Sequence, residues 1–209
     1  MGDELRGENL VHLNVRFSTE TELKKIQDFL YEKSGQGVSF TGLVEAMANE
    51  VTIVTAVHNI KSNKGSRTAG VDKIKMDKYL QMPKDEFILL IQSSFRNYRP
   101  KPARREYIEK SNGKKRPLGI PTVLDRIIQE CVRIIIEPIC EARFYPQSYG
   151  FRPYRAQKHA IRGIINVINA GCKSPDQPVW AIEGDIKGCF DNINHRLLLQ
   201  KLWRIGIHD

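Results

Sequence analysis

Apolar residues recur every three or four positions along much of this 209-residue chain, which is the period of amphipathic helices. A capping box, Thr19 with Glu22, marks the start of the first helix, and Gly35 marks its end. Pro138 is expected to break the fourth helix, because proline removes a helical N–H donor. The predicted helices cover residues 19–35, 41–58, 83–97, 122–137 and 155–170, and a last one begins near residue 194.

Two stretches carry strand signals. Residues 105–109 alternate, Asn112-Gly113 is a strong hairpin turn, and residues 116–120 return as an edge or irregular strand because of Pro117. Residues 179–185 read as a strand that ends at Asp185 and is followed by a turn carrying Phe190. Residues 1–17 lack a clear period and are expected to be a flexible lead-in, and residues 61–72, rich in Gly, Ser and Asn, predict a loop.

Composition predicts a soluble, globular protein. The chain is 41% apolar, but no apolar stretch approaches the roughly 20 residues of a membrane helix, and the N-terminus lacks a signal core. A cytoplasmic protein without a membrane partner is therefore expected, most simply in a bacterial cytoplasm. Four cysteines without CxxC spacing are interpreted as reduced core residues, and Trp203 is likewise expected in the core.

The positive charge is concentrated in the middle third. Residues 1–58 hold 5 basic and 9 acidic side chains, residues 59–120 hold 16 and 6, and residues 121–209 hold 12 and 9. The segment from Arg96 to Arg116 contains nine basic residues and only two acidic ones, Glu106 and Glu109. Such a block favours a polyanion and salt-dependent binding, and the alternative is an ordinary solvated basic face.

Several residues in these segments suit nucleotidyl transfer. Two divalent cations would need hard oxygen ligands, and Asp185 with the carbonyl of Ile186 could supply them; the alternative is an aspartate that caps a turn. Lys110 and Arg116 flank the hairpin turn and suit phosphate oxygens, unless they are ordinary hairpin decoration. Phe190 could lie under a nucleotide sugar or belong to the core.

An ordered series of motifs resembles the reverse transcriptases encoded by group II introns, the intron maturases. The series comprises Asn63-Lys64-Gly65 through Ala69-Gly70-Val71-Asp72, then Tyr98-Arg99-Pro100, residues 112–121 with Asp125-Arg126, residues 148–153, and residues 185–193. The resemblance covers roughly residues 55–209, and residues 1–54 carry no matched motif.

The resemblance implies an α+β right-hand polymerase. It implies a helix-rich N-terminal extension (1–58), fingers with a basic loop and hairpin (59–177), and the start of a palm with a small antiparallel sheet (178–209). By position, Asp185 matches the first metal-binding aspartate for two Mg²⁺ ions. The matched nucleotide-binding residues are Lys110, Arg116, Arg104 and Phe190. The expected RNA-binding residues are Lys61, Lys64, Arg67, Arg99, Lys101, Arg105, Lys114, Lys115 and Arg152.

The implied activity is RNA-directed DNA synthesis together with intron RNA binding. Its partners would be intron RNA, an RNA template, a DNA primer and deoxynucleoside triphosphates. The family's second carboxylate cluster, Tyr-Ala-Asp-Asp, has no counterpart here, so this chain alone is expected to bind RNA without extending a primer. The alternatives are an RNA-binding splicing cofactor without polymerase activity, or a retron, diversity-generating or CRISPR-linked reverse transcriptase. Apolar residues of the last helix suggest a possible homodimer.

Overall fold

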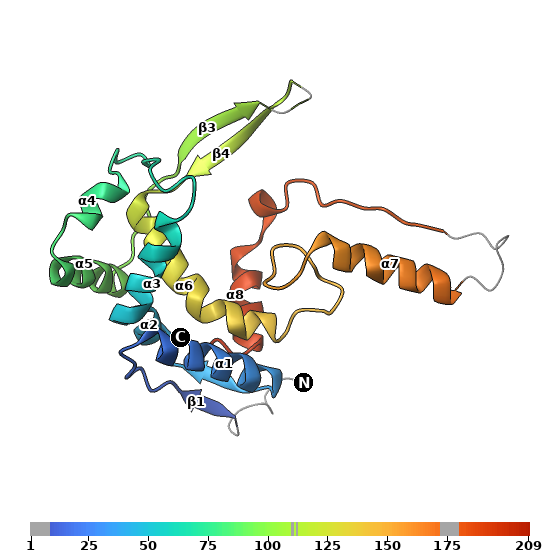
Figure 1. Cartoon of the computed structure of the whole chain (residues 1–209), viewed down its shortest axis with the longest axis horizontal. Helices are drawn as coiled ribbons and strands as arrows, with labels where there is room; N and C mark the ends of the chain where they lie inside the picture. The colour runs from blue at the N-terminus through green and yellow to red at the C-terminus, as the bar shows by residue number, and fades with distance from the viewer. Residues whose placement is uncertain (1–8, 110, 112, 172–179) are drawn as a thin grey trace.

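Three long helices form the body of the protein in the computed structural model, which describes residues 9–109, 111, 113–171 and 180–209. They are α1 (Glu20–Gly35), α3 (Glu50–Lys61) and α6 (Val123–Glu141), and α6 packs against both others (Figure 1). Ile127, Ile135 and Ile139 of α6 are fully buried in this core. The apolar periodicity of these segments therefore matches the face that each helix buries.

The capping box at the start of α1 is confirmed. The Thr19 hydroxyl accepts the Glu22 N–H at 3.2 Å, and the Glu22 carboxylate accepts the Thr19 N–H at 3.2 Å. The same carboxylate accepts the Ser18 N–H at 2.7 Å, and this bond is the largest of several that lower the pKa of Glu22. Two otherwise unpaired helix donors are thereby satisfied by local sequence alone.

The single helix expected over residues 41–58 is wrong. The chain forms two helices, α2 (Leu43–Met47) and α3, with Asn49 between them. The Asn49 side chain accepts the Val51 N–H at 2.8 Å, and its amide donates to the carbonyls of Val15 and Phe17 at 3.1 and 3.2 Å. A side chain used in this way begins a new helix rather than continuing the old one.

The expected flexible lead-in is wrong from residue 9 onward. Strand β1 (Leu10–His12) pairs in parallel with β2 (Ser39–Thr41), so Thr41 belongs to a strand. Leu13 and Phe17, which follow β1, are buried in the core. The lead-in is therefore part of the helical body.

The end of the chain joins this small sheet. The N–H of the fully buried Phe40 donates to the Gly206 carbonyl at 2.7 Å, and the His208 N–H donates back to the Phe40 carbonyl at 3.1 Å. The Asp209 carboxylate then accepts the N–H groups of Gly42 and Val44 at 2.9 and 2.8 Å, capping α2. Residues 206–209 thus tie the last helix to the first sheet.

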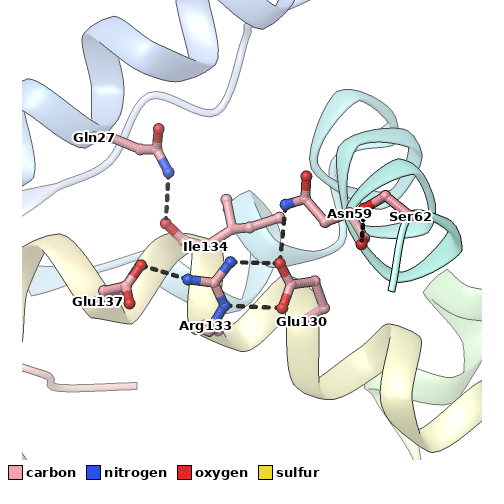
Figure 2. Close-up of polar contacts among 7 residues, drawn as sticks. All are labelled: Gln27, Asn59, Ser62, Glu130, Arg133, Ile134 and Glu137. Carbon is pink, nitrogen blue, oxygen red and sulfur yellow. Dashed lines mark hydrogen bonds and ion pairs between the residues drawn. The ribbon is translucent and has the colours of Figure 1, made fainter. Parts of the chain in front are cut away.

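Helix α6 does not end before Pro138, contrary to the expectation. Pro138 has no N–H for the carbonyl of Ile134, four residues earlier, but the Gln27 side chain of α1 donates to that oxygen at 3.0 Å (Figure 2). The Ser34 hydroxyl, also on α1, donates to the Ile139 carbonyl at 2.9 Å. The Gln27 bond therefore replaces the lost helical one, and the Ser34 bond adds a second contact between α1 and α6.

The remaining elements surround this body. The short helix α4 (Met76–Leu80) was not expected, whereas α5 (Lys84–Arg96) agrees with the sequence. The hairpin is confirmed as antiparallel β3 (Arg104–Glu109) and β4 (Lys115–Ile120), and Figure 1 shows it projecting away from the helices. The chain continues through α7 (Gln157–Gly171), the 3-10 turn η1 (Phe190–Asn192) and α8 (His195–Arg204).

Several expectations fail in this last third. Residues 180–186 form no strand, so no palm sheet is present among the described residues, and the antiparallel sheet that is present is the β3–β4 hairpin. Trp203 is exposed and stacks on His208 with ring centroids 4.1 Å apart. Cys131 is a buried free thiol as expected, but Cys189 is exposed, and Cys172 lies outside the described residues.

The apolar faces of α7 and α8 are also exposed. Exposed members of these faces include Ile161, Ile164, Ile165 and Ile168 on α7 and Leu197, Leu198 and Leu199 on α8. None of the described residues of α7 is buried. Figure 1 shows this helix standing apart from α1 and α3. The suggested homodimer stays a prediction.

Candidate nucleic-acid interface

Two arginines hold a basic loop, residues 62–72, against the body of the protein. The Arg126 guanidinium on α6 donates through Nη1 to the Gly65 carbonyl at 2.9 Å and through Nη2 to the Thr68 carbonyl. Arg104, at the start of β3, donates through Nε to the Ala69 carbonyl at 3.1 Å. The loop expected from sequence therefore has a defined course, fastened to both α6 and the hairpin.

Gly70 allows the loop to approach α6 closely. It is buried, and a Cβ at this position would lie 2.7 Å from Cα and 2.8 Å from the N atom of Thr122, the N-cap of α6. Backbone atoms cannot yield as a flexible side chain can, so any larger residue would push the loop outward. A glycine is needed here for space.

A polar cluster built on Asp125 lies beside this contact. The buried Asp125 carboxylate accepts the hydroxyls of Thr122 at 2.6 Å and Tyr98 at 3.0 Å, and the backbone N–H of Lys101 at 3.4 Å. Burial, together with the hydrogen bond to Asp125, raises the pKa of Tyr98 to about 12. The cluster fixes the segment leading into the hairpin relative to α6.

Most of the expected RNA-binding side chains are exposed. Six of them make no side-chain hydrogen bond or ion pair within the described part of the chain: Lys61, Lys64, Arg67, Arg99, Arg105 and Lys115. The same holds for Arg116, one of the expected nucleotide-binding residues. Lys114 is exposed as well. Because the loop and the base of the hairpin meet at Arg104, these cations belong to one continuous region of the fold.

The hairpin presents cations on both of its faces. Residues directly opposite in an antiparallel pair share a face, and Arg116 pairs with Ile108 while Lys115 pairs with Glu109. Arg116 therefore lies on the face of Arg104, and Lys115 on the face of Arg105. The other expected phosphate ligand at the turn, Lys110, lies outside the described residues.

Three of the expected ligands already have partners inside the protein. Lys101 lies 3.6 Å from the Asp72 carboxylate, and Arg104 pairs with Glu106 as well as with the loop. Arg152 is the most enclosed, with a side chain only 7% exposed.

Arg152 fastens the segment after α6. Its guanidinium contacts the Glu141 carboxylate through Nε and Nη2 at 2.9–3.1 Å and donates through Nη1 to the carbonyls of Tyr145 and Ser148 at 2.9 and 3.0 Å. All three nitrogens are used, so the geometry gives Arg152 a structural role and leaves it little capacity for phosphate.

The expected metal and sugar contacts are exposed. Asp185 and Ile186 lie on an extended segment at the surface, and Phe190 in η1 is 88% exposed, which excludes a core role in this structure. The described residues bring no three acidic, His or Cys side chains together as metal ligands. These residues alone do not fit a two-metal site.

Sequence reasoning missed the positions that shape the interface. Arg126 and Gly70 both lie within the motif series, but their positions in it do not indicate what they contact. Their contacts join residues 52 to 61 positions apart, so membership of the motif series is the one sequence signal that marks them.

The comparisons with known proteins decide the family. Residues 108–209 match the family model described as reverse transcriptase (RNA-dependent DNA polymerase). The chain is 42% identical over 161 residues to the group II intron-encoded protein LtrA of Lactococcus lactis, covering 77% of this chain and 25% of LtrA. This chain belongs to the group II intron-encoded reverse transcriptase and maturase family.

Other relatives show the same partial overlap. Protein YkfC of Escherichia coli is 42% identical over 151 residues, which is 68% of this chain and 37% of YkfC. The mitochondrial nuclear intron maturase 1 of Arabidopsis thaliana is 27% identical over 158 residues, covering 76% of this chain and 19% of that protein. The chain thus spans between about a quarter and a little over a third of the length of LtrA and of YkfC.

In the part of the chain that the structure describes, none of the helices is both long and apolar enough to span a bilayer.

Proposed function

We propose that this chain supplies the fingers and the first part of the palm of an RNA-directed DNA polymerase, and that its own activity is to bind intron RNA. The proposed division is an N-terminal extension over residues 1–58, fingers over 59–177 and the start of the palm over 178–209. The template, primer and deoxynucleoside triphosphates are proposed partners of the same region.

One observation carries the proposal: Lys64 and Arg67 on the basic loop and Arg105, Lys115 and Arg116 on the projecting hairpin are exposed cations that have no side-chain partner among the described residues. Unpaired surface charge of one sign is what a polyanion neutralises, with release of its counterions. In a purely structural basic region the cations would instead form ion pairs and hydrogen bonds inside the protein, as Arg152 does.

The intron lineage is supported by the relatives, since several of those proteins are named intron-encoded proteins or intron maturases. A splicing cofactor without polymerase activity is the second candidate. It is favoured by the exposed Asp185, which has no cluster of metal ligands around it in the described residues. Both candidates require RNA binding by the same surface.

RNA binding is tested by fluorescence anisotropy with a labelled RNA hairpin over a series of salt concentrations. Replacing Lys61, Lys64 and Arg67 together by glutamine should weaken binding and lower the slope of log K against log[salt] by about 0.9 per lost phosphate contact. Exposed Lys24 and Lys25 on α1, also replaced by glutamine, provide the control.

An unchanged slope in the triple variant would refute the assignment of the loop to RNA. The two candidates separate at Asp185, which is replaced by alanine in a full-length family member that synthesises DNA. Loss of synthesis with RNA binding retained supports the polymerase assignment, whereas normal synthesis would remove Asp185 from it.

A further inference from the structure

We propose that Arg126 is a positioning residue: it holds the basic loop in the shape that presents Lys64 and Arg67 to RNA, without contacting RNA itself. The inference rests on the proposed function of the loop. In this role Arg126 preorganises the interface and does not bind RNA directly.

Arg126 binds two carbonyls that lie close together in the loop. The oxygens of Gly65 and Thr68 lie on either side of Ser66 and Arg67, so the guanidinium closes the turn from within. The backbone of this turn is also bonded internally, from Ser66 N–H to Asn63 at 3.0 Å and from Thr68 N–H to Gly65 at 3.1 Å. Ser66 is consequently buried, whereas Arg67 is exposed.

The side-chain chemistry of arginine suits this positioning role. A planar guanidinium presents its Nη atoms as a rigid fork that can bind two carbonyls at once, whereas a lysine ammonium is a single point. The Arg126 Nε is buried without a hydrogen-bond partner in the described residues. Burial lowers the pKa of Arg126, and the nearby Asp72 carboxylate acts in the opposite direction. Each Nη of Arg126 donates one of its two N–H groups to the loop and the Nε is enclosed, so three of its five N–H donors are turned toward the protein and away from RNA.

The contacts that Arg104 and Gly70 provide lie further along the loop. Arg104 binds the Ala69 carbonyl, and Gly70 packs on Thr122. Between residue 62 and Thr68, Arg126 provides the contacts to α6 that fix where the turn lies. Releasing it should loosen the segment with Lys64 and Arg67 while leaving the base of the hairpin in place.

The experiment compares Arg126→Gln and Arg126→Lys with Arg143→Gln in the 209-residue chain. Arg143 is exposed and has no side-chain partner in the described residues, so its variant loses the same charge without touching the loop. Two readouts are used: the rate of trypsin cleavage after Lys64 and Arg67 without RNA, and affinity for a labelled RNA hairpin. A Lys64→Gln, Arg67→Gln pair is also combined with Arg126→Gln.

Both Arg126 variants should be cleaved faster in the loop and should bind RNA roughly tenfold more weakly, the factor expected if binding must order one more residue of backbone. The loss in the combined variant should be smaller than the product of the separate losses, because a loosened loop already uses its cations poorly. Arg143→Gln should show neither effect beyond a small charge term.

Full affinity and full protection in Arg126→Lys would overturn the inference, because a point charge would then suffice. Multiplicative losses in the combined variant would also overturn it, since Arg126 would be contributing to binding independently. If Arg126→Gln loses its helical circular dichroism, the lysine variant decides. If the parent chain shows no salt-dependent RNA binding, the proposed function fails, and the cleavage rates still show whether Arg126 shapes the loop.

Discussion

The bond from Gln27 to the carbonyl of Ile134 gives a prediction that can be worked from the structure. The acceptor has no helical donor because residue 138 is proline, and Ile134 lies in the core. In Gln27→Ala this carbonyl would be left unsatisfied. A buried polar group without a partner costs about 1–3 kcal/mol, which for a protein of this size lowers Tm by about 2–4 °C per kcal/mol.

The measurement is thermal and urea unfolding followed by circular dichroism. Gln129→Ala is the matched control, because Gln129 is an exposed residue of α6 without a hydrogen-bond partner in the described residues, and the change brings the same gain in helix propensity. It should alter stability by less than about 0.5 kcal/mol. The difference between the two variants isolates the hydrogen bond.

A double-mutant cycle sharpens the test. Pro138→Ala restores an N–H that can donate to Ile134, so Gln27→Ala should be less destabilising in that background than in the parent chain. An equal loss in both backgrounds would show that Gln27 does not substitute for the missing helical donor. A Gln27→Ala chain as stable as the parent would refute the reasoning altogether.

Three further predictions concern other parts of the molecule. The 209-residue chain should give no template-dependent primer extension with Mg²⁺ and deoxynucleotides, because its described residues gather no set of three metal ligands; any measurable extension product contradicts this. In a Cys172→Ser background, Ellman's reagent should modify exposed Cys189 rapidly but leave Cys131, whose pKa burial raises to about 12, unreacted until unfolding. Burial opposes ionisation of Glu130, but hydrogen bonds from Arg133 and Asn59 outweigh burial and lower the pKa of Glu130 (Figure 2). The ionised carboxylate therefore stabilises the fold fully above the unfolded pKa near 4.3, and this stabilisation is lost as the pH falls through the folded pKa. Glu130→Gln should lower the free energy of unfolding at pH 7 and flatten its pH dependence on the acid side, and an unchanged dependence would count against this reasoning.

The elements that sequence predicted well are those with local causes. The capping box at Thr19, the β3–β4 hairpin and the apolar stripe of α5 involve residues within a few positions of one another, and each is confirmed. The errors at Pro138 and at residues 9–17 have distant causes. Gln27 lies 107 positions from the carbonyl that it satisfies, and Leu10 pairs with Ser39.

The candidate interface divides in the same way. Net charge along the chain identified the region, because exposed cations are visible in composition. It could not separate Arg67, which is exposed, from Arg152, which is enclosed by Glu141 and two carbonyls. That distinction depends on which acceptors the fold brings near each guanidinium, and spacing along the chain does not encode it.

The contact between Phe40 and residues 206–208 can form only after the end of this chain has been synthesised. Asp209, whose carboxylate accepts the Gly42 N–H, is translated 167 positions after Gly42. At a synthesis rate of roughly 5–20 residues per second, that interval is about 8–33 s. During those seconds the described residues offer Phe40 only Leu10–His12 as a strand partner, so the half-built sheet has an open edge on the nascent chain. Slowing translation of the last segment should therefore lengthen the period in which the protein is open to aggregation or to chaperone binding.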